Sequence, residues 1–121
     1  MRPKNYKLTE EDQWCVNKFI KDFCQYDKHG EVAKTFLNGY CYWFSKMLDG
    51  RFLYGEILYE PVEGHFVYKL YDHYYDIRGD VTEEYAGKKF YTEEECLDIP
   101  SIVIGCMTKI YLDEWRETYP L

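Results

Sequence analysis

Three residues of the sequence have the types and the order of a thiol-based catalytic site. Cys41 follows an Asn-Gly pair in the stretch NGYCYWFSKML, at the predicted start of a short apolar helix. A helix N-terminus favours a thiolate, because its free backbone N–H groups and the helix dipole favour negative charge. His65 and Asp76 follow on two predicted strands. A thiol, an imidazole and a carboxylate in contact can act as nucleophile, base and orienting group.

The strand pattern predicts how His65 and Asp76 meet. The aromatic and β-branched residues over 65–70 and 73–77 favour two strands of a hairpin. With a loop centred just after Leu70, His65 would lie directly opposite Asp76, with Cβ atoms about 5 Å apart. Other even-length loops would change the pairing but keep both side chains on one face. We expect Asp76 to accept the imidazole N–H and fix its tautomer. If the helix with the cysteine packs across this face, the three residues form a nucleophile, a base and an orienting group.

Each of these residues also has a structural interpretation. Cys41 alone is typical of a buried thiol, His65 of a hydrogen-bonded strand histidine, and Asp76 of a turn cap. A metal site could be formed by His65, Asp72, His73 and Asp76, but these ligands would have to converge, and His73 and Asp76 have opposite strand parity. We therefore expect neither a metal site nor a cofactor.

The elements around these residues predict an α+β fold. Three strands, 55–60, 65–70 and 73–77, form a β-meander, and a helix from 41 ends near Gly50. Thr9 is the expected N-cap of a first helix that ends near Gly30, and its apolar stripe comprises Val16, Phe19, Ile20 and Phe23. Helices packed on a small antiparallel meander then form a single domain over residues 1–121.

The C-terminal part predicts short helices. Thr82 and Thr92 each precede a Glu-Glu pair, as Thr9 does, and are expected to cap helices in the same way. A last helix runs over 98–117, capped by Asp98, with Pro100 in its first turn. Its expected buried face comprises Val103, Cys106, Met107 and Ile110. The thiols expected to be buried for structural reasons are Cys15, Cys24, Cys96 and Cys106.

Composition excludes several classes of function. The net charge of −7 over 121 residues argues against direct binding to a nucleic-acid backbone or to an anionic membrane. The five cysteines are odd in number and form no CxxC pair, which argues against a disulfide framework or a structural zinc site. The N-terminus does not resemble a signal peptide, and no apolar run approaches a membrane span. A cytoplasmic location is expected.

The stretches NGYCYWFSKML and GEILYEPVEGHFVYKLYDHYYDIRG, within residues 38–79, resemble the core of papain-like cysteine peptidases. The resemblance is to their small bacterial and phage forms, including the transglutaminase-like branch. It implies a papain-like core in which Cys41 is the nucleophile, His65 the base and Asp76 the orienting residue. Papain has a Gln before its cysteine as oxyanion donor. The nearest amide here is Asn38, which could instead be an N-cap, leaving the Cys41 backbone N–H as donor.

These residues predict a thiol-dependent hydrolase or acyl transferase that acts on an amide or isopeptide bond of a protein or peptide. One alternative is a non-enzymatic acidic phage or mobile-element protein that inhibits or adapts a host protein by direct binding. The 14 tyrosines fit that alternative, because tyrosine is enriched at interfaces. A second alternative is a degenerate relative that keeps the core for structure alone. The reactivity of Cys41 distinguishes these hypotheses.

Overall fold

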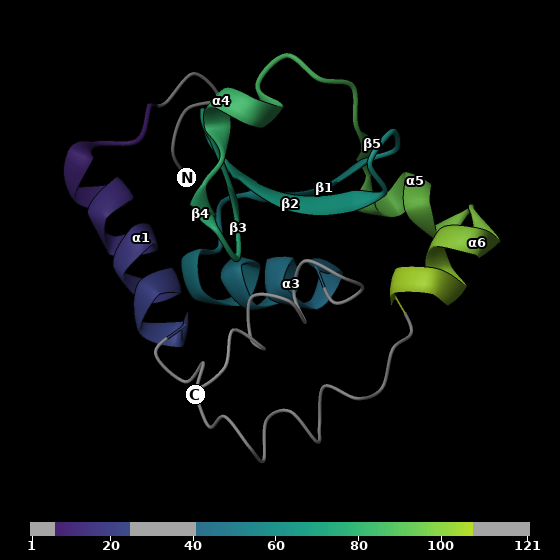
Figure 1. Ribbon diagram of the computed structural model, residues 1–121, viewed down its shortest axis with the longest axis horizontal. Coiled ribbons are helices and arrows are strands. Elements are labelled where there is room, and N and C mark those ends of the chain that lie inside the picture. Colours follow the sequence, from purple (N-terminus) through teal and green to yellow (C-terminus); the bar gives the residue numbers. More distant parts are fainter. Residues whose placement is uncertain (1–6, 25–40, 108–121) are drawn as a thin grey trace.

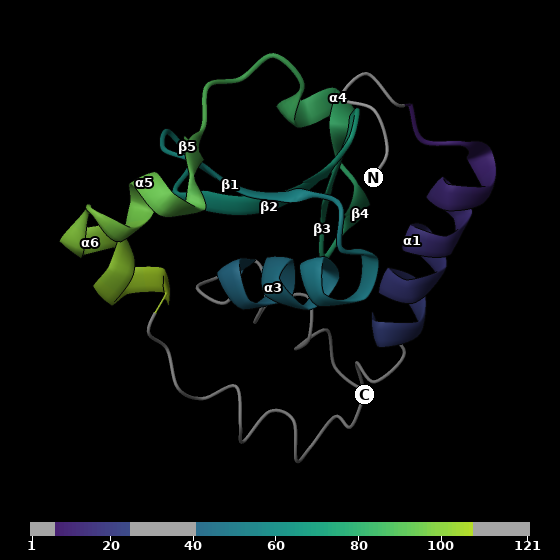
Figure 2. The same ribbon diagram turned by 180° about the vertical axis from the view of Figure 1, so that it is seen from behind.

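The computed structural model describes residues 7–24 and 41–107, which form helices around one antiparallel sheet (Figures 1 and 2). This is the α+β fold that the sequence predicts. The helices are α1 (Glu10–Cys24), α3 (Cys41–Phe52), α4 (Thr82–Tyr85), α5 (Glu93–Leu97) and α6 (Pro100–Ile102), followed by a π-helical turn, η1 (Val103–Met107). The strands are β1 (Glu56–Glu60), β2 (His65–Leu70), β3 (His73–Asp76), β4 (Gly79–Asp80) and β5 (Tyr91–Thr92).

The predicted three-strand meander forms the centre of a five-stranded sheet. The strand order is β4-β3-β2-β1-β5, and every neighbouring pair is antiparallel. The two edge strands have two residues each, too few to give an alternating pattern in the sequence. Figures 1 and 2 show α3 along one face of the sheet and α4 beyond the other.

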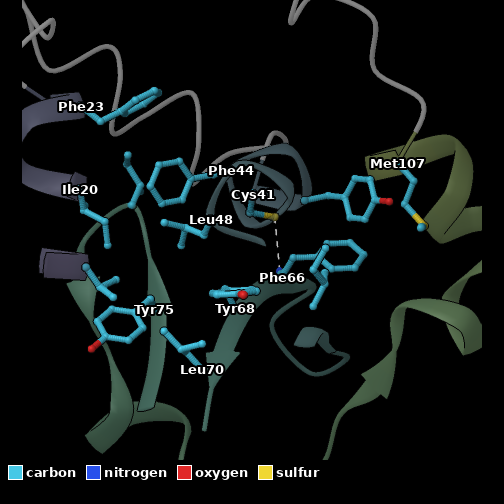
Figure 3. Packing of buried hydrophobic residues seen from close by; sticks show 14 of the residues in the cluster. Ile20, Phe23, Cys41, Phe44, Leu48, Phe66, Tyr68, Leu70, Tyr75 and Met107 are labelled. Atoms are coloured by element: carbon cyan, nitrogen blue, oxygen red, sulfur yellow. Dashed lines mark hydrogen bonds between the residues drawn. The ribbon is translucent and has the colours of Figure 1, made fainter. Parts of the chain in front are cut away.

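The two faces of the sheet carry separate apolar clusters. Phe66, Tyr68 and Leu70 of β2 belong to the larger cluster, which includes residues of α1 and α3 (Figure 3). Val67 belongs to the smaller cluster, which includes Tyr85 of α4. Because successive side chains of a strand point to opposite faces, β2 is buried on both sides. Strand β2 therefore contributes side chains to both apolar clusters.

The predicted buried face of α1 is nearly correct. Val16, Ile20 and Phe23 are buried, whereas Phe19 is half-buried and packs edge-on against the ring of Phe52. The prediction that Cys15 is buried is wrong, because this residue lies on the solvent side of the helix. Of the other thiols expected to be buried, Cys96 is buried and Cys24 is partly exposed.

Two of the three predicted threonine caps are present. The Thr9 hydroxyl accepts a hydrogen bond from the Asp12 backbone N–H at 3.0 Å, and Thr92 forms a complete capping box. The prediction for Thr82 is wrong. Its hydroxyl accepts the backbone N–H of Tyr74 and donates to Asp80, so it links the neighbouring strands instead of capping α4.

The last helix and the end of α3 differ from the sequence prediction. Pro100 starts α6 as expected, but Ile99 is the N-cap and Asp98 instead follows α5. Met107 is buried and Val103 is partly buried. Helix α3 continues through Gly50 to Phe52. The predictions for Gly30, Ile110 and the side chain of Cys106 lie outside the described residues.

Among the described residues, no helix combines the length and the apolar character needed to cross a membrane.

Candidate active site

Cys41 is the first residue of α3, as the sequence predicts. Its Sγ atom accepts a hydrogen bond from the backbone N–H of Phe66 at 3.4 Å, which joins the start of α3 to the start of β2 (Figure 3). The cysteine is 4% exposed and packs with the larger apolar cluster. A reaction at this sulfur therefore requires the substrate to displace part of its cover.

His65, the first residue of β2, is hydrogen-bonded to Asp76 at the end of β3. The distance between His65 Nε2 and Asp76 Oδ2 is 2.8 Å, and both side chains are buried. The prediction that the two residues lie directly opposite each other is wrong. The register pairs Tyr68 with Tyr75 and Leu70 with His73, so the loop is centred one residue later than expected. The shift keeps strand parity, and the two side chains meet diagonally on one face.

The helix carrying Cys41 does not pack on the face that bears His65 and Asp76. Those two residues share their face with Val67 and the cluster under α4, whereas α3 packs on the opposite face. Cys41 interacts with the imidazole because it lies at the very start of α3, beside the first residues of β2. Cys41 and His65 are the first residues of α3 and β2, and both lie at the start of β2. The thiol therefore reaches the imidazole past the end of this strand, although α3 packs on the opposite face of the sheet.

The protonation of His65 depends on both neighbours. Burial lowers the pKa of its imidazole, but hydrogen bonding to Asp76 and to the Cys41 side chain outweighs burial and raises the pKa to about 9. The imidazole is therefore an imidazolium at neutral pH. Because Nε2 is bonded to Asp76, the nitrogen left for Cys41 is Nδ1. An imidazolium beside a thiol is the arrangement that activates cysteine nucleophiles.

Asp76 is ionised and fully hydrogen-bonded, largely through Arg78. Burial alone would raise the pKa of the Asp76 carboxyl, but the hydrogen bonds from His65 and Arg78 hold it below its usual range. Oδ1 accepts the Arg78 backbone N–H at 2.8 Å, and Oδ2 accepts from Arg78 Nη2 at 2.6 Å. Arg78 is not among the site residues predicted from the sequence. Its position two residues after Asp76 is the only signal that could have indicated it.

A pocket of about 320 Å³ opens beside the imidazole, on the α4 side of the sheet. It is lined by Glu63, His65, Arg78, Glu84 and Tyr85. The Tyr85 hydroxyl donates to Glu63 Oε2 at 2.6 Å, and the Tyr85 ring lies 6.0 Å from the His65 ring. The turn between β1 and β2 and helix α4 are thereby joined over the histidine.

Two other residues were considered from the sequence, Asn38 as an oxyanion donor and His73 as a metal ligand. Asn38, the candidate oxyanion donor, lies outside the described residues. His73 is not close to the site; its Nδ1 lies 2.7 Å from Asp80 Oδ2, in a second His–Asp pair of the same sheet. Within residues 7–24 and 41–107, no cluster of three or more His, Cys, Asp or Glu side chains could hold a metal ion.

The fold and this cluster define a small α+β protein with a cysteine, a histidine and an aspartate gathered at one end of its sheet. Comparison with known families places it more narrowly. The model of the family described as Phage YunG-like protein matches residues 16–103, and the chain belongs to that family. The matched range includes Cys41, His65 and Asp76. No curated protein and no solved structure matches the chain.

Proposed function

We propose that this protein is a thiol-dependent hydrolase or acyl transferase with a papain-like site, acting on an amide or isopeptide bond of a protein or peptide. The observation that carries the proposal is the placement of His65: its Nε2 atom lies 2.8 Å from Asp76 Oδ2, and Cys41 Sγ lies 3.4 Å from the backbone nitrogen of the next residue, Phe66. The raised pKa of the imidazole, about 9, supports the same interpretation. The odd number of cysteines supports a cytoplasmic location for this chemistry.

In the proposed reaction, the Cys41 thiolate attacks the substrate carbonyl carbon, and the carbonyl electron pair moves onto oxygen. The His65 imidazolium then gives its Nδ1 proton to the leaving nitrogen as the C–N bond breaks, which leaves a thioester on Cys41. Water or a second amine attacks the thioester and loses a proton to the now neutral His65. The C–S bond breaks, and the thiolate–imidazolium pair is restored. Asp76 stays ionised throughout and holds the ring.

Acylation by an activated ester tests this proposal. The protein is incubated with a p-nitrophenyl ester, and acylated peptides are mapped by mass spectrometry with and without hydroxylamine, which cleaves thioesters. We expect a hydroxylamine-sensitive acyl group on Cys41 in the wild type, much slower acylation in His65→Ala, and none at this position in Cys41→Ser. His73→Gln is the matched control, because His73 belongs to the other His–Asp pair.

The cysteines provide internal references for the same experiment. Cys15 is exposed and reports the rate of an accessible thiol, whereas Cys96 is buried and reports the rate of an inaccessible one. Acylation of Cys41 at the rate of Cys96, or at a rate that His65→Ala leaves unchanged, would refute the proposal.

A second candidate function is a non-enzymatic protein that inhibits or adapts a host protein by binding. Two observations favour it: Cys41 is only 4% exposed, and the family to which the chain belongs is described as Phage YunG-like protein. Under this alternative Cys41 is a core residue. Cys41→Ala would then cost stability without removing any reactivity, and no acyl group would form on Cys41 in the wild type.

A further inference from the structure

Arg78 binds the Asp76 carboxylate and also lines the pocket beside His65, where its Nη2 atom lies 3.5 Å from the Tyr85 hydroxyl. Its Nε atom lies 3.2 Å from Oδ1 and 3.1 Å from Oδ2 of the carboxylate, and its Nη2 lies 2.6 Å from Oδ2. The remaining nitrogen, Nη1, lies 3.1 Å from Glu84 Oε2. The guanidinium therefore joins Glu84 of α4 to Asp76 at the end of β3.

In the reactive state of the proposed function, four groups would form a row of alternating charge: the Cys41 thiolate, the His65 imidazolium, the Asp76 carboxylate and the Arg78 guanidinium. Asp76, in the middle of this row, is 2% exposed, and the His65 side chain is 9% exposed. Leaving a buried charge uncompensated is costly, because water cannot solvate it. With one imidazolium and two anions, the row would carry a net negative charge. The cation of Arg78 brings the total to zero.

We propose that Arg78 is a positioning residue that neutralises the second anion of the site, so that Cys41 can be a thiolate beside His65 while Asp76 remains ionised. This inference rests on the proposed function. It assigns the role to the charge of Arg78, since the backbone N–H of the same residue already orients Asp76 Oδ1.

The other charged groups near Arg78 are on α4 and on the turn between β1 and β2. Glu84 and Glu63 each have side chains that are 42% exposed, and Lys88 lies 3.4 Å from Glu63. Tyr85 is neutral, because burial and its bond to Glu63 raise the pKa of its hydroxyl. Solvent and salt screen the exposed carboxylates more than they screen the Arg78–Asp76 pair. Arg78 is therefore the cation that sets the charge balance.

The pH dependence of Cys41 alkylation by iodoacetamide tests this role. In wild type, Arg78→Lys and Arg78→Gln, the rate at Cys41 is followed by peptide mapping from pH 5 to 10. Arg78→Gln should move the midpoint upward by about one pH unit, the order expected for one charge across a partly buried site. Arg78→Lys should stay near the wild type. Arg51→Gln, at the far end of α3, removes the same charge away from the site and should leave the midpoint unchanged.

A second pair of variants keeps the test valid if Arg78→Gln does not fold. Glu84→Lys replaces the carboxylate that pairs with Arg78 Nη1 by a cation and should move the midpoint downward, whereas Glu83→Lys makes the same charge change at the adjacent residue, which is also exposed, and should move it less. Equal midpoints for Arg78→Gln and the wild type, or for the two α4 variants, would overturn the role of Arg78. If Cys41 reacts equally fast in the wild type and in His65→Ala, the proposed function itself is refuted instead.

Discussion

Raising the pH from 6.5 to 9 should destabilise the folded protein through His65. The imidazole has a pKa of about 9 in the folded protein, against about 6.5 in an unfolded chain. Between these values the folded protein keeps a proton that the unfolded chain releases. The stabilisation from His65 is therefore fully present below about pH 6.5 and is lost as the pH rises through 9.

The size of this loss follows from the difference between the two pKa values. Each pKa unit corresponds to about 1.4 kcal/mol, and the imidazole keeps some contact with solvent, which reduces the effect. We expect the free energy of unfolding to fall by about 2–3 kcal/mol across this range because of His65 alone.

Urea denaturation at pH 6.5, 7.5, 8.5 and 9 measures this loss. His65→Gln removes the titrating group, so the difference between its pH dependence and that of the wild type isolates His65. His73→Gln is the control, since it alters a histidine of the same sheet that also pairs with an aspartate. If the free energy of unfolding falls by the same amount in wild type and His65→Gln between pH 6.5 and 9, the His65 imidazole does not have a raised pKa in the folded protein.

Three further predictions concern packing and helix formation, and all can be measured by urea denaturation at pH 7. Leu48→Ala should cost about 2–5 kcal/mol, because Leu48 is fully buried and its truncation leaves a cavity, whereas half-buried Phe19→Ala should cost less; equal costs would contradict the packing of α1. Gly55→Ala should cost about 1–3 kcal/mol, because its new Cβ would lie 2.4 Å from the Tyr68 ring. Gly50→Ala, inside α3 with nothing within 4 Å, should be neutral or stabilising by up to about 1 kcal/mol, and a loss there would contradict the helix.

The sequence predicted the central strands because their patterns are long and local. Strand β2 was predicted with its exact bounds, and β1 and β3 each differ by one residue at one end. Strand parity put His65 and Asp76 on one face whatever the loop length. The register itself could not be predicted, because Tyr71 and Asp72 form the turn between β2 and β3 and Tyr71 adopts a positive φ of 56°. A tyrosine gives no sequence signal for that conformation.

Two parts of the site were not predicted, for different reasons. The face on which α3 packs had a signal in the sequence: Phe66, Tyr68 and Leu70 make one face of β2 fully apolar, whereas His65 and Lys69 lie on the other face with Val67, so the alternation favours a helix on the face opposite His65. Arg78 had no comparable signal. An arginine after a strand usually lies in solvent, and only the fold places its guanidinium against the buried carboxylate of Asp76.

The central claim is that Cys41 is held as a reactive thiolate by His65. The most direct measurement is the iodoacetamide alkylation rate of each cysteine, mapped by mass spectrometry from pH 5 to 10 in wild type and His65→Ala. We predict that wild-type Cys41 reacts faster than exposed Cys15 at mildly acidic pH, despite its burial, and that His65→Ala moves its profile to higher pH. If Cys41 reacts as slowly as Cys96, or equally fast with and without His65, the claim is contradicted.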